Sequence, residues 1–280
     1  MDILPREAKI LQLFHPFPYL TDTQALHLLA ARGIYKLGSA KAISAKLKRF
    51  TEENYLYRTT PLVDIVGGSA FYVYWLGAKG RHYLADEYHY DFSEWRHPSR
   101  MTDFVKSSHV WHCLGVTDFL IAASYLPHVN NHIQIKTMFH DFTLKREMQG
   151  CPVIPDGLIK FASGDEPCIW LELDRDTEKE EAFTSKLRRI IALMGHGFDE
   201  WFETPLALFT WAFVTPLGEH RVGEMRTACE KLLHEMKHEQ LGEKFLFAYL
   251  PTSCDPHHVF LSPVWEMPFQ SHKYPLFAIE

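Results

Sequence analysis

Two acidic motifs stand within otherwise apolar segments, and they constrain the fold of this chain more than any other feature. The first is Pro155-Asp156 and the second is Glu172-Leu173-Asp174, and β-branched, aliphatic and aromatic residues flank both. These flanks predict two buried β-strands, with a hairpin-like turn at Ser163-Gly164-Asp165-Glu166-Pro167 between them. Because unpaired carboxylates are costly to bury, we expect Asp156 and Glu172 to share a hard cation such as Mg²⁺ or Mn²⁺.

A plainer interpretation of both motifs stays open. An Asp that follows Pro at a strand edge is often only a turn or capping residue. Residues two apart share one face of a strand, so Glu172 and Asp174 can also lie on a solvated face. The spacing alone therefore does not establish a metal site.

The composition indicates a globular protein with two domains. The 280 residues are 46% hydrophobic and 23% charged, and the five cysteines have no paired spacing. The start of the chain carries no basic and apolar leader, and no apolar run reaches the roughly 20 residues needed to span a bilayer. We expect a cytoplasmic protein with reduced cysteines and no membrane insertion.

The charge is distributed unevenly along the chain. Residues 1–85 contain 11 basic and 6 acidic side chains, a balance of +5, whereas the remainder carries 18 basic and 29 acidic ones, a balance of −11. A basic opening module favours contact with the phosphates of double-stranded DNA, because phosphate neutralisation supplies most non-specific affinity.

The pattern of the first 86 residues is typical of a winged helix-turn-helix domain. Apolar spacing and capping residues predict helices over 5–14, 22–32 and 39–50. Two alternating aromatic segments, 55–60 and 71–75, follow, with Gly67-Gly68-Ser69 as a hairpin tip. In such a module the third helix enters the major groove. The predicted DNA contacts are therefore Ser39, Lys41, Ser44, Lys48 and Arg49, although a merely solvated helix face is the alternative.

The rest of the chain predicts a linker over 87–102 and a second domain over 103–280. A long helix is expected from Asp103 to Tyr125, and further helices over 181–194 and 219–241. The two acidic strands, an alternation at 133–136 and the segment 206–215 supply a mixed sheet. This second domain is expected to be α/β.

The order of several motifs resembles the replication-relaxation family of plasmid and mobile-element proteins. The motifs are Leu4-Pro5-Arg6-Glu7, the segment from Tyr74 to Arg81, the segment from His112 to Asp118, Pro155-Asp156, the run from Glu172 to Glu178, the segment from Lys186 to Arg189, and Val214-Thr215-Pro216. The resemblance covers residues 4–235. It implies a DNA-binding protein with an N-terminal winged helix and a role in plasmid replication and relaxation.

The second domain is also similar to the restriction-endonuclease-like nucleases. Their signature is Pro-Asp, followed by Asp or Glu, any residue, and Lys; here Asp174 stands at the Lys position. Because that Lys is missing, we hypothesise that Lys186 on the next helix supplies a displaced cation, while Asp156 and Glu172 hold Mg²⁺ or Mn²⁺ and Asp174 assists the metal or water. A solvated helix face is the alternative for Lys186, and a core imidazole is the alternative for His112. Under the same hypothesis, two residues of the preceding helix take part. His112 and Asp118 position the substrate or transfer a proton.

Other functions stay open. The same fold without catalysis would act as a replication or transcription regulator. A homodimer and a replication or mobilisation partner protein are further expectations. The motif His234-Glu235-Met236-Lys237-His238 matches the zinc-peptidase pattern, but the apolar stripe of its predicted helix leaves both His on the solvated side. Chance occurrence in a chain with 17 His is the simpler account.

Overall fold

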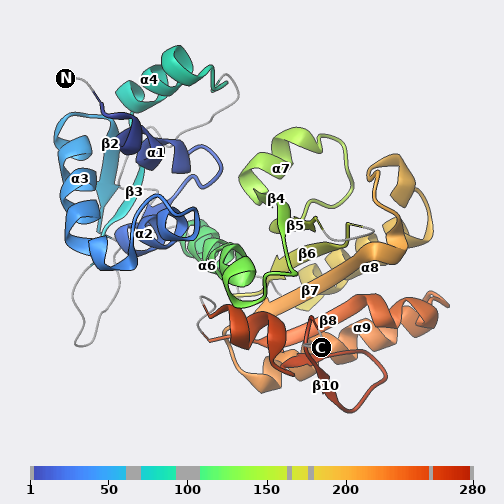
Figure 1. Ribbon diagram of the computed structural model, residues 1–280. Helices are drawn as coiled ribbons and strands as arrows, with labels where there is room; N and C mark the ends of the chain where they lie inside the picture. Colours follow the sequence, from blue (N-terminus) through green and yellow to red (C-terminus); the bar gives the residue numbers. More distant parts are fainter. Residues whose placement is uncertain are drawn as a thin grey trace. The chain divides into compact units, whose positions relative to one another are not determined.

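The chain divides into two compact units, Met1–Thr117 and Asp118–Glu280, whose elements are shown in Figure 1. A computed structural model describes residues 3–60, 71–92, 108–162, 166–175, 180–251 and 255–277. Helix α6 (Ser108–Val129) begins in the first unit and ends in the second. Of the predicted linker over 87–102, residues 87 and 88 belong to helix α4 (Ala78–Tyr88), and residues 93–102 lie outside the described part.

The three helices predicted for the first unit are present, as α1 (Pro5–Leu13), α2 (Asp22–Ala31) and α3 (Ala40–Glu52). Thr21 begins α2, since its hydroxyl accepts a hydrogen bond from the N–H of Gln24, whose side chain accepts one from the N–H of Thr21. This reciprocal pair satisfies N–H groups that a helix start otherwise leaves open. A 3-10 turn, η1 (Leu37–Ser39), leads into α3. The inward face of α3 is fully buried and consists of Ile43, Leu47 and Phe50.

Among the described residues of this unit, short strands form an antiparallel sheet in the order β1–β3–β2. Their bounds are β1 (Leu20–Thr21), β2 (Leu56–Thr59) and β3 (Val73–Leu76). The predicted hairpin tip at Gly67-Gly68-Ser69 lies outside the described residues. The start of helix α4 packs closely against the chain that precedes β2. A Cβ atom on Gly77 would lie 2.5 Å from the carbonyl oxygen of Asn54, and a Cβ atom on Gly80 would lie 2.2 Å from the carbonyl oxygen of Tyr55. Only glycine permits this approach.

The second unit combines helices with a mixed sheet, as expected for an α/β unit. Its described strands follow the order β10–β9–β8–β7–β6–β5–β4. Strands β4, β5 and β6 pair antiparallel, whereas β6, β7 and β8 pair parallel. The bounds are β4 (Ile135–His140), β5 (Gly157–Phe161), β6 (Cys168–Leu173), β7 (Phe209–Thr215), β8 (Phe245–Tyr249), β9 (Trp265–Glu266) and β10 (Lys273–Tyr274).

Helices connect the parallel strands, as parallel pairing requires. Helix α8 (Glu180–Gly195) joins β6 to β7, and α9 (Glu219–Glu235) joins β7 to β8. Both pack on one face of the sheet, over a core that includes Trp170, Trp211 and Phe245. Because side chains alternate along a strand, Glu172 lies on the same face of β6 as Trp170. The other helical segments among the described residues are α7 (Asp141–Glu147), η2 (Phe198–Glu200), η3 (Leu206–Leu208), η4 (Glu239–Lys244) and the π-helical turn η5 (His257–Leu261).

Several predicted boundaries of the second unit were wrong. The segment predicted as a strand from Leu206 starts with the turn η3, and the helix predicted over 219–241 ends at Glu235. Strand β8 was missed because a strand buried on both faces shows no alternation. The start of the helix predicted from Asp103 and the turn residues 163–165 lie outside the described part. Within the described residues, none of the helices combines the length and apolar character needed to cross a membrane.

Candidate functional site

The side chain of Glu172 is buried between β6 and the helical layer. Only 2% of the residue is exposed. One carboxylate oxygen, Oε1, accepts a hydrogen bond of 2.6 Å from the indole N–H of Trp170. The other, Oε2, forms an ion pair with the ammonium group of Lys186 on α8. Strand β6 thus places a carboxylate inside the protein, where it is held on both oxygens.

Asp156 lies beside Glu172, immediately before β5. Its backbone N–H donates to the carbonyl of Leu171 at 3.0 Å. Its carboxylate oxygen Oδ2 accepts a hydrogen bond of 2.8 Å from the N–H of Leu173. The side chain of Asp156 therefore reaches the backbone of β6 at the residue that follows Glu172. The two acids that the sequence singled out thus lie on adjacent parts of the sheet, Asp156 directly before β5 and Glu172 on β6.

Burial and neighbouring charges act on the carboxylate of Glu172. Burial is the main cause that raises the pKa of Glu172 to about 7, and the negative charge of Asp156 adds to it, against the lowering effect of Lys186. A pKa this high means that the ionised form is disfavoured at its present position. Lys186, the predicted displaced cation, is the group that offsets the cost.

The arrangement fits a hard divalent cation. Mg²⁺ and Mn²⁺ prefer carboxylate oxygens, and a cation between Asp156 and Glu172 would relieve both their repulsion and the burial of Glu172. The residues that could hold it are these two acids, each with one oxygen anchored by a neutral N–H donor. Metal binding itself stays a prediction.

Asp174 lies in a different environment from the two acids. It directly follows β6, is 9% exposed, and its Oδ2 is 2.6 Å from Nε of Arg221 on α9. Its N–H donates to the carbonyl of Val214 in β7. The guanidinium of Arg221 also pairs with Glu224. Asp174 thus ties β6 to the first turn of α9, and its predicted assistance to a metal or water stays a prediction.

The two candidates on α6 belong to different units. Asp118 lies in the second unit, where its charge acts on the half-buried guanidinium of Arg175. Burial lowers the pKa of Arg175, and the carboxylate of Asp118 opposes this effect. His112 lies in the first unit and is half-buried. Their predicted roles in positioning or proton transfer stay predictions.

A buried pair at the end of β4 was missed from the sequence. Nδ1 of His140 is 2.5 Å from Oδ1 of Asp141, and the N–H of Asp141 donates to the carbonyl of Asp156. Burial raises the pKa of Asp141. The hydrogen bond and charge of His140, together with the charge of Lys145, outweigh this effect and hold the pKa of Asp141 well below its usual range. The backbone hydrogen bond of Asp141 joins the start of α7 to the chain at Asp156. No local signal marked its role, since Asp141 and Asp156 come together only in the fold.

Helix α3 presents part of the predicted DNA-contact set to solvent. Lys41 and Lys48 are exposed, and Lys48 makes only a long pair with Glu52, at 3.8 Å. Ser39 is half-buried at the start of the helix. Ser44 donates a hydrogen bond of 2.8 Å to Asp22 of α2. Of the five predicted DNA contacts, Lys41 and Lys48 are therefore exposed to solvent.

Arg49, in contrast, is bound internally. Its Nη2 lies 2.9 Å from Oε2 of Glu7 on α1, and Nζ of Lys46 lies 2.5 Å from Oε1 of the same carboxylate. Burial raises the pKa of Glu7, but hydrogen bonds from Arg49 and Lys46 outweigh this effect and lower the pKa to about 2. The sequence marked Arg49 as part of a basic face, but its cation joins α3 to α1.

The zinc-peptidase pattern does not fit the structure. Helix α9 ends at Glu235, and Lys237 has a positive φ of 59°, so the chain turns between the two His. Nδ1 of His234 lies 2.8 Å from Oε1 of Glu239, and the side chain of His234 is 79% exposed. Two ligands at i and i+4 need one continuous helix to share a metal. The predicted helix through His238 was wrong, and with it the basis for this alternative.

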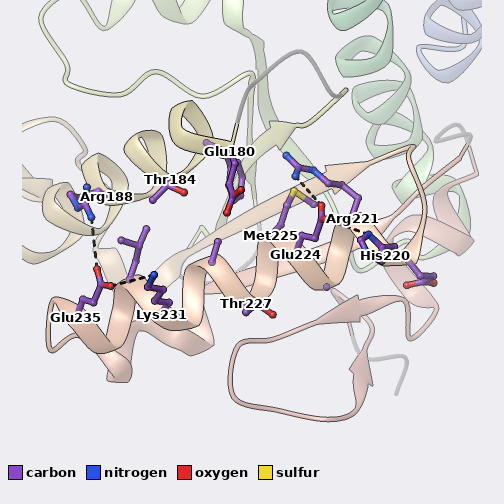
Figure 2. A pocket seen from close by; sticks show the side chains of 15 residues that line it. Glu180, Thr184, Arg188, His220, Arg221, Glu224, Met225, Thr227, Lys231 and Glu235 are labelled. Atoms are coloured by element: carbon purple, nitrogen blue, oxygen red, sulfur yellow. Dashed lines mark hydrogen bonds and ion pairs between the residues drawn. The ribbon is translucent and has the colours of Figure 1, made fainter.

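A pocket of about 740 Å³ lies on α8 and α9, away from the acidic pair. Figure 2 shows Arg188 and Lys231 pointing to Glu235 at one end and Arg221 near Glu224 at the other. Its lining includes none of Asp156, Glu172 and Lys186. The candidate metal site is therefore defined by the carboxylates of Asp156 and Glu172 and not by this pocket.

Comparison with known families assigns the chain to a family by its sequence. A family model described as replication-relaxation matches residues 11–201, which is more than half of the chain. The chain belongs to the replication-relaxation family. The part matched to the replication-relaxation family includes α3 and the three residues Asp156, Glu172 and Lys186, whereas His234 lies beyond it. No curated protein and no solved structure matches the chain.

Proposed function

We propose that this member of the replication-relaxation family binds double-stranded DNA with its first unit and cuts or nicks it with its second. The setting would be the replication of a plasmid or mobile element, which the family description suggests. The observation that carries the proposal is that Asp156 reaches the backbone of β6 at the residue after Glu172, whose buried carboxylate pairs with Lys186.

The order of elements in the first unit supports DNA binding. Three helices with a sheet ordered β1–β3–β2 follow the plan of a winged helix. In that plan α3 is the helix that enters the major groove. Its exposed lysines, Lys41 and Lys48, would neutralise phosphates, and the +5 balance of residues 1–85 favours the same partner.

The order of elements in the second unit supports a restriction-endonuclease-like core. Helix α6, the antiparallel strands β4, β5 and β6, the crossover α8 and the parallel strand β7 follow that plan. Asp156 stands at the start of β5 and Glu172 on β6, as in the nuclease signature. The cation that the signature places two residues after Glu172 comes instead from Lys186 on α8, where its ammonium reaches Glu172.

The residues of this chain would divide the work of phosphodiester hydrolysis. Asp156 and Glu172 would hold Mg²⁺ or Mn²⁺, which when bound acts as a Lewis acid and lowers the pKa of water. Lys186 pairs with the buried carboxylate, where its ammonium group would also stabilise negative charge on the phosphoryl oxygens. The ion pair of Asp174 with Arg221 fixes the loop that follows β6.

A second candidate is the same protein without catalysis. It is favoured by Asp174, which stands at the usual Lys position and is already paired with Arg221. Such a protein would bind DNA as a replication or transcription regulator, with a homodimer or a partner protein at the acidic unit.

Cleavage of supercoiled plasmid DNA with Mg²⁺ or Mn²⁺ separates the two candidates. The wild-type protein should give nicked or linear DNA, and a chelator should abolish the products. Asp156→Asn and Glu172→Gln should reduce the rate by about 100-fold or more, because a bound metal supplies several kcal/mol of stabilisation. Glu235→Gln, which changes an exposed carboxylate on α9, is the matched control. Equal rates in all four proteins, or cleavage that resists chelator, would reject the nuclease assignment.

A further inference from the structure

The indole of Trp170 holds one of the two oxygens of Glu172. Its N–H donates to Oε1 at 2.6 Å, inside the protein, where neither residue is more than 2% exposed. Lys186 holds Oε2. A carboxylate bound on opposite sides by a donor and a cation has little freedom to rotate about its last torsion. The orientation of Glu172 is therefore set by these two contacts together.

The ring of Trp170 is itself held in place by aromatic packing. It stacks on Trp211 of the neighbouring strand β7, with ring centroids 5.6 Å apart and planes 29° apart. Phe202 contacts it from another side, with centroids 5.6 Å apart. In the β6–β7 register Trp170 lies directly opposite Trp211. The donor that faces Glu172 thus belongs to the rigid core and not to a mobile surface group.

We infer that Trp170 is a positioning residue for the proposed metal centre, through which Glu172 presents its carboxylate beside Asp156. This inference rests on the proposed function. A neutral donor on Oε1 orients the carboxylate without competing as a cation, in the way that outer hydrogen-bond partners orient metal ligands. Removal of such a partner weakens metal affinity by about 10-fold to 100-fold in known sites.

Trp211 supplies a matched control for this role. It is fully buried in the same cluster, but its indole N–H has no hydrogen-bond partner among the described residues. Trp170→Phe and Trp211→Phe therefore remove similar ring volume from neighbouring positions, and only the first removes a bond to Glu172. A purely structural role of Trp170 would make the two variants behave alike.

The test is the affinity of the full chain for Mn²⁺ alone, measured by calorimetric titration after circular dichroism has verified the fold of each variant. Trp170→Phe should bind Mn²⁺ about 10-fold more weakly than the wild type, and Trp211→Phe less than about twofold more weakly. If Trp170→Phe does not fold, 3-benzothienylalanine at position 170 keeps the ring size, because its sulfur replaces the N–H and cannot donate. The same 10-fold loss is then expected.

The outcomes distinguish this inference from the function on which it rests. A wild-type protein that binds Mn²⁺, with equal affinities in the Trp170 and Trp211 variants, overturns the positioning role and leaves the metal centre intact. A wild-type protein that does not bind Mn²⁺ overturns both. A loss of cleavage in Trp170→Phe that saturating Mn²⁺ restores would support the inference, because positioning acts on metal binding.

Discussion

The buried carboxylate of Glu172 should make the stability of the protein depend on pH in a defined range. Burial and the charge of Asp156 raise its pKa from 4.5 to about 7 in the folded state. The folded protein then binds this proton more tightly than the unfolded chain. The stability linked to Glu172 is therefore fully present below about pH 4.5, and it is lost as the pH rises through 7. A pKa difference of this size corresponds to about 3 kcal/mol.

Glu172→Gln removes the titrating group and keeps an acceptor for the indole of Trp170. The free energy of unfolding would be measured in guanidinium chloride with chelator present, at several pH values between 4 and 8. The wild type should lose about 3 kcal/mol relative to Glu172→Gln across this range, since all other titrating groups are common to both proteins. Glu235→Gln, at an exposed position, should follow the wild type.

Parallel curves for the wild type and Glu172→Gln would refute this reasoning. They would mean that the carboxylate titrates near its ordinary value and is not enclosed between Trp170 and Lys186. A relative change in the opposite direction, with the wild type gaining stability at higher pH, would mean that Lys186 outweighs the cost of burial.

Three further predictions concern contacts outside the acidic pair. Glu7→Gln should lower the free energy of unfolding by about 2 kcal/mol at pH 7, because the substitution removes the carboxylate that Lys46 and Arg49 of α3 share. This loss should shrink as the pH falls below about 4, where the carboxylate of Glu7 begins to be protonated. A denaturation midpoint equal to that of the wild type at pH 7 would contradict the prediction. Lys41→Ala and Lys48→Ala should each weaken duplex binding in fluorescence anisotropy and lower its salt slope by about one, whereas salt slopes equal to that of the wild type would place the DNA elsewhere. The wild type and His234→Ala should take up no stoichiometric Zn²⁺ in metal analysis after dialysis, and loss of a bound ion in the variant would contradict the turn that follows α9.

The local chemistry of the sequence predicts much of the first unit. Capping residues and inward apolar stripes predicted its three helices, and in the structure Thr21 caps α2 while Ile43, Leu47 and Phe50 line the buried face of α3. Whether a charged side chain is exposed or bound within the protein cannot be predicted from the local sequence in the same way. Arg49 resembles Lys48 in the sequence, but only the fold brings Glu7 of α1 beneath it.

The two acids could be singled out because they interrupt apolar segments, and in the structure Asp156 bonds to the backbone of β6 beside Glu172. The partners that define its environment could be predicted only in part. Lys186 was marked by its place beside the inward stripe of α8, and it does reach Glu172. The roles of Trp170 and Arg221 were not predicted. The hydrogen bond of Trp170 to Glu172 depends on side-chain rotamers, and the ion pair of Arg221 with Asp174 depends on how α9 packs against the end of β6.

The most direct test of the central claim is a crystal structure of the full chain grown with Mn²⁺, with the anomalous signal of manganese recorded. The account predicts one strong anomalous peak bound by carboxylate oxygens of both Asp156 and Glu172. A map without a peak there, in which Lys186 alone still neutralises Glu172, would contradict it.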